Sequence, residues 1–210
     1  MKVYVGLSGG VDSSVTAALL KEQGHDVTGV FMKNWATDLP GFECPWKEDY
    51  MDAKRVAVHL GIDFKMYDFQ KEYKQKVVAY MIDEYKAGRT PNPDIMCNQE
   101  VKFKLFLETA VEDGAEMIAT GHYARIKDGK LFKAKNTDKD QTYFLYRVTK
   151  DALSKSLMPI ADFKTKQEVR ELAKKFNLPT ADKKDSQGIC FVGKVGIREF
   201  LEQYIDVNPG

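Results

Sequence analysis

The chain has 210 residues, 32 of them basic and 31 acidic, and a formal net charge of only +1. That length allows one large domain with a good core, or one domain and a fragment. The balanced charge gives no general sign of nucleic-acid binding, so any RNA contact would need a local basic patch. No apolar run reaches about 18 residues, and we expect neither a membrane span nor a signal peptide.

The cysteines indicate the redox compartment. There are three, Cys44, Cys97 and Cys190. An odd and sparse set is typical of a reducing compartment rather than a disulfide scaffold, so we expect a cytoplasmic protein. Because no two cysteines have Cys-x-x-Cys spacing, we expect no structural zinc site.

The hydrophobic pattern alternates between short apolar runs and helical periodicity. Strands are predicted at 2–7, 26–32, 63–68 and 115–120, and helices at about 12–23, 48–60, 70–87 and 101–113. The alternation predicts an α/β fold, a parallel sheet with helices on both faces. Ligands of such sheets bind beyond the carboxyl ends of the strands. We therefore expect three segments that follow strands to converge there: 8–14, 32–35 and 120–125.

The pattern changes to short helices from residue 136 onward. We expect an α/β domain over 1–135 and a small, mostly helical extension over 136–210 that packs on it and carries Cys190. Asp128-Gly129 between short apolar runs predicts a β-hairpin. Thr165 followed three residues later by Glu168 predicts a capped helix that runs to about residue 176.

The most informative segment is Ser8-Gly9-Gly10-Val11-Asp12-Ser13-Ser14, between the first predicted strand and the first helix. A glycine-rich turn at this place aims backbone N–H groups toward an anion at the helix N-terminus. The segment lacks the lysine of a Gly-x-x-x-x-Gly-Lys loop, so it is not built to hold a γ-phosphate. It predicts a phosphate-binding loop; the plainer alternative is a turn that caps an ordinary helix.

The second informative segment is Arg89-Thr90-Pro91-Asn92-Pro93-Asp94-Ile95-Met96-Cys97-Asn98. Two prolines stiffen a chain, so we expect a rigid loop that holds Asp94 and Cys97 in a fixed relation. Cys97 would then precede the next helix, whose N-terminus lowers the pKa of a nearby thiol, with help from Lys102 and Lys104. The alternative is a small buried hydrophobe that happens to be cysteine.

The remaining candidates are less specific. Cys190 follows Lys183 and Lys184, which would also lower a thiol pKa, whereas Cys44 has no charge pattern around it and is treated as structural or incidental. His122 is a candidate for hydrogen bonding to a nucleotide, and a structural histidine is the equal alternative. Cations that could contact RNA are Arg89, Lys102, Lys104, Lys139, Arg147, Lys183 and Lys184.

Taken together, these motifs resemble the tRNA-specific 2-thiouridylases, a family of PP-loop ATP pyrophosphatases. The first motif is shared across PP-loop enzymes, while Pro-Asn-Pro-Asp…Cys and Gly-Ile-Cys-Phe are specific to this group. The resemblance covers nearly the whole chain through Gly6–Ser14, Met32–Trp35, Gly88–Asn98, Thr120–Tyr123, Lys139–Leu145 and Lys184–Phe191.

The resemblance implies a Rossmann-like PP-loop fold that binds ATP and Mg²⁺. Asp12 would hold the metal, and Met32 and Gly121 would lie near the adenine or ribose. The family's tRNA substrate is bound with its wobble uridine flipped out, and the ring oxygen attacks the α-phosphate of ATP. The nucleotide-binding residues would be Gly6, Leu7, Ser8, Gly9, Gly10, Val11, Asp12, Ser13, Met32 and Gly121.

The resemblance also implies roles in sulfur transfer. Cys190 would carry a persulfide loaded by an upstream sulfur donor protein, Cys97 would free its terminal sulfur, and a Cys97–Cys190 disulfide would form. Asp94 would be the general acid or base. The family is expected to act as a monomer and to continue into two mainly β domains that this sequence does not contain. Target-base and tRNA contacts would be Asn92, Pro93, Asp94, His122, Lys139, Asp140 and Gln141.

Two alternatives stay open. The first is another PP-loop enzyme, such as an amidotransferase synthetase subunit or a lysidine synthetase, which needs the loop but no reactive cysteine pair. The second is a nucleotide-binding module without catalysis, which would bind ATP and never release pyrophosphate.

Overall fold

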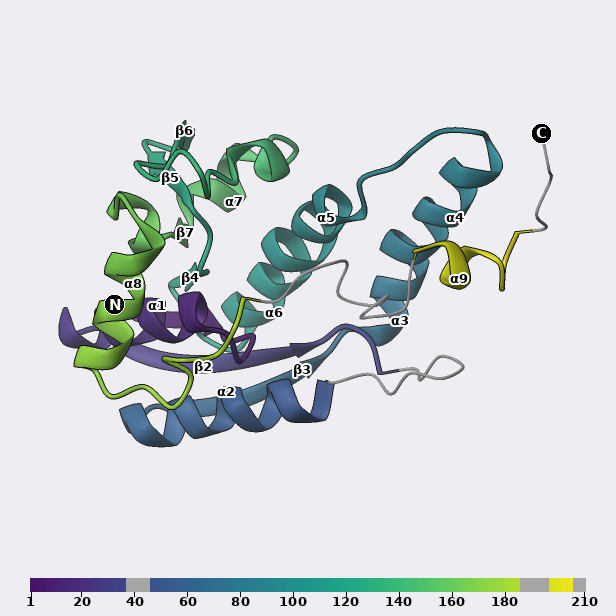
Figure 1. The fold of residues 1–210 in the computed structure, drawn as a ribbon. Coiled ribbons are helices and arrows are strands. Elements are labelled where there is room, and N and C mark those ends of the chain that lie inside the picture. The colour runs from purple at the N-terminus through teal and green to yellow at the C-terminus, as the bar shows by residue number, and fades with distance from the viewer. Residues whose placement is uncertain (37–45, 186–196, 206–210) are drawn as a thin grey trace.

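The structure is a computed structural model that describes residues 1–36, 46–185 and 197–205 (Figure 1). Of the short helical segments, η1 and η2 are π-helical, and η3 and η4 are 3₁₀. The elements in chain order are β1 (Lys2–Gly6), α1 (Val11–Glu22), β2 (Asp26–Lys33), α2 (Trp46–Leu60), β3 (Asp63–Asp68), α3 (Gln70–Tyr73), η1 (Lys74–Val78), α4 (Ala79–Lys86), α5 (Pro93–Met96), η2 (Cys97–Leu105), α6 (Phe106–Glu112), β4 (Met117–Ala119), β5 (Ala124–Lys127), β6 (Lys130–Lys133), η3 (Thr142–Leu145), α7 (Lys150–Ser154), β7 (Ser156–Leu157), η4 (Pro159–Asp162), α8 (Lys166–Lys175) and α9 (Ile197–Leu201).

A parallel sheet forms the centre of the molecule. In the described ranges its strand order is β3-β2-β1-β4-β7, and every neighbouring pair is parallel. The four predicted strands are confirmed. From β1 the chain moves outward to β2 and β3, then returns to the other side of β1 for β4. The order of strands therefore reverses between β1 and β4, which is where ligands of open α/β sheets bind.

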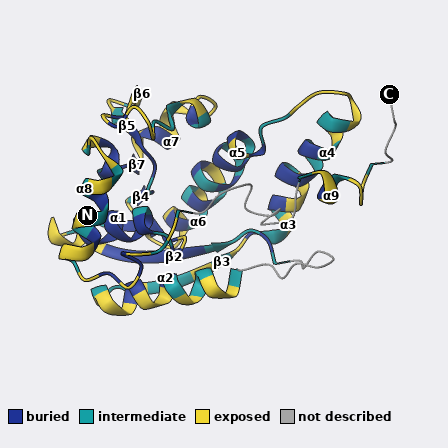
Figure 2. Ribbon diagram, in the orientation of Figure 1, coloured by how far each residue is buried: buried dark blue, intermediate teal, exposed yellow. Residues whose placement is uncertain are grey.

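Alternate residues of β1 enter different apolar clusters, so the sheet is covered on both faces. Val3 and Val5 pack in a cluster with residues of α1 and α2, whereas Tyr4 packs in a cluster with residues of η1, η2 and α6. Figure 1 shows α2 on one side of the strands and α6 on the other. Figure 2 shows β2 dark and buried, and helices whose outer faces are exposed, most clearly on α2. The predicted α/β class with two helical layers is confirmed.

A third apolar cluster joins the second half of the chain to the first. Val11 and Val15 of α1 pack in it with Val169 and Ala173 of α8. In addition, β7 extends the main sheet by pairing with β4. The two-residue β7 is too short for hydrophobic periodicity to predict. The boundary at residue 136 stays a prediction.

The helix predicted at 101–113 begins earlier than expected. Helical structure starts at Pro93 and continues through α5, η2 and α6 to Glu112. Asn92 caps it, because its side-chain oxygen accepts a hydrogen bond from the backbone N–H of Asp94 at 3.1 Å. Proline is favoured at the first helical position, since its missing N–H would have no partner there. The second proline of the motif therefore starts a helix rather than stiffening a loop.

Two local predictions are confirmed. The β5–β6 hairpin turns at Asp128 and Gly129, which have φ of 53° and 67°, as a two-residue turn of this kind requires. Thr165 caps α8 by accepting a hydrogen bond from the N–H of Glu168 at 3.2 Å. Across the described ranges, every helix is too short or too polar to span a lipid bilayer.

Candidate phosphate-binding site

The glycine-rich loop after β1 lies against the ends of two neighbouring strands. A Cβ atom placed on Gly6 would lie 3.0 Å from the Met32 side chain at the end of β2. One placed on Gly121, after β4, would lie 2.8 Å from the backbone of Asp12 and Ser13 at the start of α1. The predicted convergence of these segments at the carboxyl edge of the sheet is confirmed.

Gly9 fits its position because it has no side chain. Its φ is 77°, and a Cβ atom there would lie 2.5 Å from the backbone oxygen of Asp49 on α2. Both the left-handed backbone and the close approach therefore require glycine. The result is a tight turn held between the sheet and α2.

The N-terminus of α1 is left without a side-chain cap. Gly10 is the N-cap and has no side chain to offer. The hydroxyls of Ser13 and Ser14 donate instead to the Gly10 carbonyl, at 3.2 and 2.7 Å. Because the first N–H groups of a helix have no intrahelical partner, they remain as donors for an anion.

A lysine from a distant element enters this loop. Lys166, the first residue of α8, places its Nζ 2.7 Å from both carboxylate oxygens of Asp12. The Tyr123 hydroxyl donates to the same carboxylate at 2.8 Å. Burial and the Asp12 carboxylate both raise the pKa of Tyr123, so it stays a protonated donor. Sequence reasoning missed Lys166, because no local pattern indicates that α8 packs on α1.

Lys166 also belongs to an ion-pair network around Asp185. The Asp185 carboxylate lies 3.0 Å from Lys166, 3.0 Å from Arg170 and 3.1 Å from Lys139. Burial alone would raise the pKa of Asp185, but hydrogen bonds from Lys166 and Lys139 lower it below its usual value. The network fastens the chain just before residue 186 to the loop after β1.

Asp94 and Cys97 lie one helical turn apart, in the first two turns of the helix that begins at Pro93. A helix holds these two residues in a fixed relation, so the prediction that a rigid loop holds them is wrong. Cys97 lies inside the helical run, at the start of η2, rather than before a helix. The electrostatic effect of a helix N-terminus falls off within the first turn. The N-terminus that was expected to lower the pKa of the Cys97 thiol therefore does not lie beside it. Cys97 is buried, at 4% exposed.

Asp94 remains accessible to solvent. Its surrounding protein atoms displace part of its hydration, which raises the pKa of its carboxyl, while the positive charge of Lys102 works in the opposite direction. Because the residue is exposed on the surface, solvent limits the size of the rise. A raised carboxyl pKa favours a group that exchanges protons near neutral pH.

His122 is buried beside the end of β4. Its Nδ1 lies 2.9 Å from the Thr120 hydroxyl, and its ring packs 5.6 Å from that of Phe103. Burial lowers the pKa of His122 well below its usual value, and the charge of Lys102 adds to this. In this conformation the ring is a neutral group inside the protein. Its contact with a nucleotide or RNA stays a prediction.

The predicted RNA contacts at 139–141 are engaged within the protein. Lys139 pairs with Asp185. Asp140 accepts hydrogen bonds from the Ala134 N–H and the Thr142 hydroxyl, at 2.8 and 2.7 Å. The Gln141 side chain accepts one from the Tyr123 N–H at 2.9 Å. These side chains hold their own loop in place, and their tRNA contacts stay predictions.

The second cysteine of the motifs, Cys190, lies outside the described residues, as does Cys44. Lys183, predicted to act on the Cys190 thiol, pairs with Asp49 and Asp52 of α2 at 2.8 and 2.6 Å. Burial alone would lower the pKa of Lys183, but these two hydrogen bonds raise it above its usual value. Its charge is therefore balanced by α2.

The described residues on either side of 186–196 are both anchored. Asp185 belongs to the Lys166 network. Phe200 of α9 packs in the same apolar cluster as Cys97, and its ring lies 6.4 Å from that of Trp35. Of the described residues that flank 186–196, Asp185 is thus anchored beside the glycine-rich loop and Phe200 in the cluster that contains Cys97.

The described residues contain no group of three or more His, Cys, Asp or Glu side chains placed to hold a metal ion. The loop after β1 offers one carboxylate, that of Asp12. Magnesium bound with a nucleotide commonly uses one or two carboxylates, and phosphate oxygens complete its shell. The chemistry of the site therefore fits a phosphate-bound Mg²⁺. To bind the metal, one Asp12 oxygen would have to lose its contact with Lys166.

The reversed strand order and the Ser-Gly-Gly-x-Asp-Ser loop after β1 define a PP-loop α/β protein. Residues 1–194 match the family described as tRNA methyl transferase HUP domain, and the chain belongs to that family. A solved 4-thiouridine synthetase in complex with RNA and ATP shares the fold, with a TM-score of 0.61 and 20% identity. The match covers 96% of this chain and 50% of that one.

Curated relatives carry the name tRNA-specific 2-thiouridylase MnmA. The chain is 54% identical to that of Chromobacterium violaceum over 213 residues, covering 100% of this chain and 55% of the relative. It is 55% identical to that of Bacillus subtilis over 214 residues, covering 100% and 57%. The family resemblance drawn from the motifs is confirmed. The chain spans somewhat more than half the length of these relatives.

Proposed function

We propose that this chain is the ATP-using part of a tRNA 2-thiouridylase, which replaces the 2-oxygen of the wobble uridine by sulfur. The observation that carries the proposal is the bare N-terminus of α1 at the reversal of strand order, with Lys166 aimed into it. The names of the relatives supply the substrate class. ATP, when bound, supplies the adenylate that makes the uridine oxygen a good leaving group.

The phosphate groups would be held by two kinds of donor. Backbone N–H groups of the first turn of α1 bind and orient the anion without a side chain. Lys166 provides the positive charge that the glycine-rich loop itself lacks. Its Nζ contacts Asp12 and the Asp185 carboxylate, and these two contacts hold its positive charge beside the N-terminus of α1.

Asp12 would share the site with Mg²⁺. Its carboxylate is part-exposed and is held in position by the Tyr123 hydroxyl. Gly6, Met32 and Gly121 lie at the neighbouring strand ends, where they would contact the adenine or ribose. The assignment of these residues follows the family motifs.

The uridine and the sulfur chemistry would lie at the start of the helix from Pro93. Asn92, Pro93 and Asp94 would hold the base, and Asp94 would exchange protons with it. Cys190 would carry the persulfide delivered by a sulfur donor protein, and Cys97 would attack it to free the terminal sulfur. The packing of Phe200 in the apolar cluster of Cys97 supports a meeting of Cys190 with Cys97.

The experiment is incubation with tRNA, ATP, Mg²⁺ and a persulfide donor, with separate measurement of nucleotide products and of the RNA mass. We expect AMP and pyrophosphate, and a tRNA mass gain equal to one exchange of oxygen for sulfur. ADP and phosphate as main products would contradict the proposal, because the loop lacks the lysine of a γ-phosphate site.

Cysteine variants separate this proposal from other PP-loop activities. Cys97→Ser and Cys190→Ser should each abolish sulfur incorporation while ATP binding persists. Cys44→Ser is the matched control and should keep activity. Full activity in the Cys97→Ser, Cys190→Ser double variant would favour a PP-loop enzyme without a cysteine pair. ATP binding with no pyrophosphate release would indicate a binding module.

A further inference from the structure

The positive charge of the chain is concentrated in one stretch. Residues 124–150 contain eight basic and three acidic residues, a surplus of five, although the whole chain has a net charge of +1. The rest of the chain is therefore net acidic. This stretch contains the β5–β6 hairpin. None of the cations that the sequence analysis names as candidates for RNA contact lies in the hairpin.

Most of those other cations are neutralised by neighbours. Arg89 pairs with Glu84 at 2.6 Å, Lys104 with Glu100 at 3.5 Å, and Lys139 and Lys183 with the carboxylates described above. On the hairpin, by contrast, Lys127, Lys130 and Lys133 are exposed and form no ion pair with any described residue.

The hairpin register places Lys127 and Lys130 on one face of the hairpin and Lys133, opposite Ala124, on the other. Lys127 lies opposite Lys130 across the strands, and Arg125 lies opposite Phe132. Paired residues of an antiparallel ladder point to the same side, and the side alternates along each strand. Ile126 and Leu131 face the core, where they pack against the large apolar cluster. We call the exposed face, Arg125, Lys127, Lys130 and Phe132, the hairpin surface.

The hairpin surface contains two features that do not favour folding of the hairpin itself. Like charges directly opposite each other destabilise a strand pair, yet Lys127 and Lys130 are opposed beside the turn. Phe132 is 42% exposed, although its ring gains nothing from water. Paired cations around an exposed aromatic ring are the composition of a surface for phosphates and unstacked bases.

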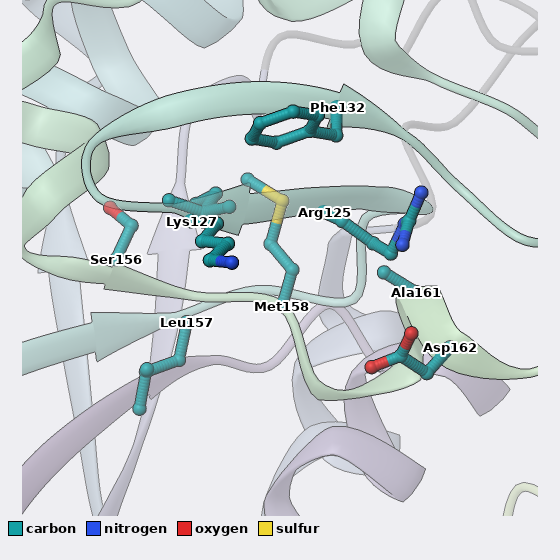
Figure 3. Close-up of a pocket in the computed structure, with 9 residues that line it drawn as sticks. Arg125, Lys127, Phe132, Ser156, Leu157, Met158, Ala161 and Asp162 are labelled. Atoms are coloured by element: carbon teal, nitrogen blue, oxygen red, sulfur yellow. The ribbon is translucent and has the colours of Figure 1, made fainter.

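A pocket lies under this surface. Figure 3 shows it between the hairpin, which carries Arg125, Lys127 and Phe132, and the segment that carries Met158 and Asp162. Its volume is about 400 Å³, within the range of small-molecule pockets. Apolar side chains on its walls and cations among them suit one nucleobase with its attached phosphate.

Contacts connect the hairpin to the helix that begins at Pro93. The Thr142 hydroxyl, which donates to Asp140, also lies 3.3 Å from the carbonyl oxygen of Phe132. Asn98, next to Cys97, donates to the carbonyl of Phe144 at 3.1 Å. The short segment 142–147 thus joins the hairpin to the proposed uridine site, and it exposes Tyr143 and Tyr146, each 64% exposed.

We propose that the hairpin surface and its pocket bind single-stranded RNA that flanks the target uridine, with cations on the phosphates and Phe132 against a base. The proposal rests on the proposed function for the identity of the RNA and names a contact surface outside the ATP and uridine sites.

The test is binding of a labelled RNA stem-loop, with a uridine in its loop, to the 210-residue chain over a series of salt concentrations. Lys127→Gln with Lys130→Gln should weaken binding about tenfold at low salt. The slope of log affinity against log salt should become shallower by about 1.5, because two phosphate contacts are lost. Removing the opposed lysines relieves repulsion, so the variant should fold at least as well as the parent.

Lys47→Gln with Lys54→Gln is the matched control. Both residues are exposed on α2, and the change in net charge is the same. This control should leave affinity and slope within about twofold of the parent. Equal losses in the two double variants would show a general effect of charge and overturn the proposal.

Phe132→Ala tests the aromatic part separately. Loss of stacking should reduce affinity about tenfold and leave the salt slope unchanged, because no counterions are involved. Unchanged RNA affinity in both hairpin variants would mean that another partner covers this face, and would overturn the proposal. Pyrophosphate release is measured in parallel with ATP, so failure of the proposed ATP chemistry is seen independently of RNA binding.

Discussion

The carboxylate of Asp12 has three protein hydrogen bonds, two from Lys166 and one from Tyr123. A metal-binding or phosphate-positioning carboxylate gains from this arrangement, because its two oxygens are oriented before any ligand arrives. Lys166 in turn lies between Asp12 and Asp185, so its position is set from both sides. This lysine, rather than one in the loop, brings positive charge to the proposed phosphate site.

Replacing Lys166 tests that role. Lys166→Met should lower the rate of pyrophosphate release by about 100-fold, because a fixed positive charge at a developing anion commonly contributes that much. Lys166→Arg should recover part of the rate. Lys164→Met, an exposed lysine two residues earlier, is the control and should behave as the parent. Rapid-quench measurement of labelled pyrophosphate distinguishes them, and a normal rate in Lys166→Met would exclude the lysine from the chemistry.

His122 makes the stability of the protein depend on pH. Its pKa is lowered by burial, so on acidification the unfolded chain takes up this proton before the folded one. The free energy of unfolding should therefore fall as pH drops below about 6.5, by at most about 1.4 kcal/mol per pH unit from this residue. Urea unfolding at pH 7.5 to 5 should show a smaller acid loss for His122→Gln.

The control for this pH effect is His25→Gln, at a histidine that is not buried. It should keep the acid loss of the parent. An identical pH dependence in the parent and His122→Gln would mean that the imidazole is protonated in the folded protein.

At the scale of elements, the turn at Gly9 joins β1, α1 and α2. Gly9→Ala should destabilise the fold by about 3 kcal/mol or more, because its Cβ would meet the backbone of α2, which cannot move cheaply. Gly24→Ala has a similar φ of 80° but nothing within 4 Å of its Cβ. It should cost only about 1 kcal/mol, for the left-handed backbone alone.

The comparison of these two glycines by equilibrium urea unfolding isolates the close contact from the backbone strain. An equal loss of unfolding free energy in the two variants would show that α2 moves to make room for a methyl group at residue 9. The packing of the glycine-rich loop against α2 would then be looser than the structure implies.

The elements with strong periodicity were predictable, and those that depend on tertiary contacts were not. Four strands and the helices after them follow from apolar runs and spacing. The sequence predicts the start of the helix before β4 at about residue 101 rather than at Pro93. The reason is that a proline can belong to a loop or stand at the first position of a helix. The spacing of the hydrophobic residues does not predict the π-helical segment that begins at Cys97.

The functional site divides in the same way. The loop residues Ser8 to Ser13 are contiguous and form a pattern, so the sequence alone predicts them as candidates. Lys166, Asp185 and the hairpin cations come together only through packing of α8 on α1 and the register of β5 with β6. Their spacing along the chain carries no signal of this proximity.

The described residues on the two sides of 186–196 are anchored at different places in the molecule. The segment 186–196 starts from Asp185, fixed by Lys166 at the glycine-rich loop, and ends before α9, whose Phe200 packs in the cluster of Cys97. Under the proposed function, these two anchors would favour a meeting of Cys190 with Cys97. Cys44 belongs to a different connection, before α2.

Mild oxidation should therefore link Cys97 to Cys190 and leave Cys44 as a thiol. Because Cys97 is only 4% exposed, its alkylation by a bulky reagent should be slower than that of a surface thiol, and faster in dilute urea. Peptide mapping by mass spectrometry after blocking of free thiols identifies the linked pair. Asp185→Asn, which weakens the anchor, should slow disulfide formation, and Asp182→Asn, at an exposed neighbour, should not. A main disulfide that contains Cys44 would contradict the proposed cysteine pair.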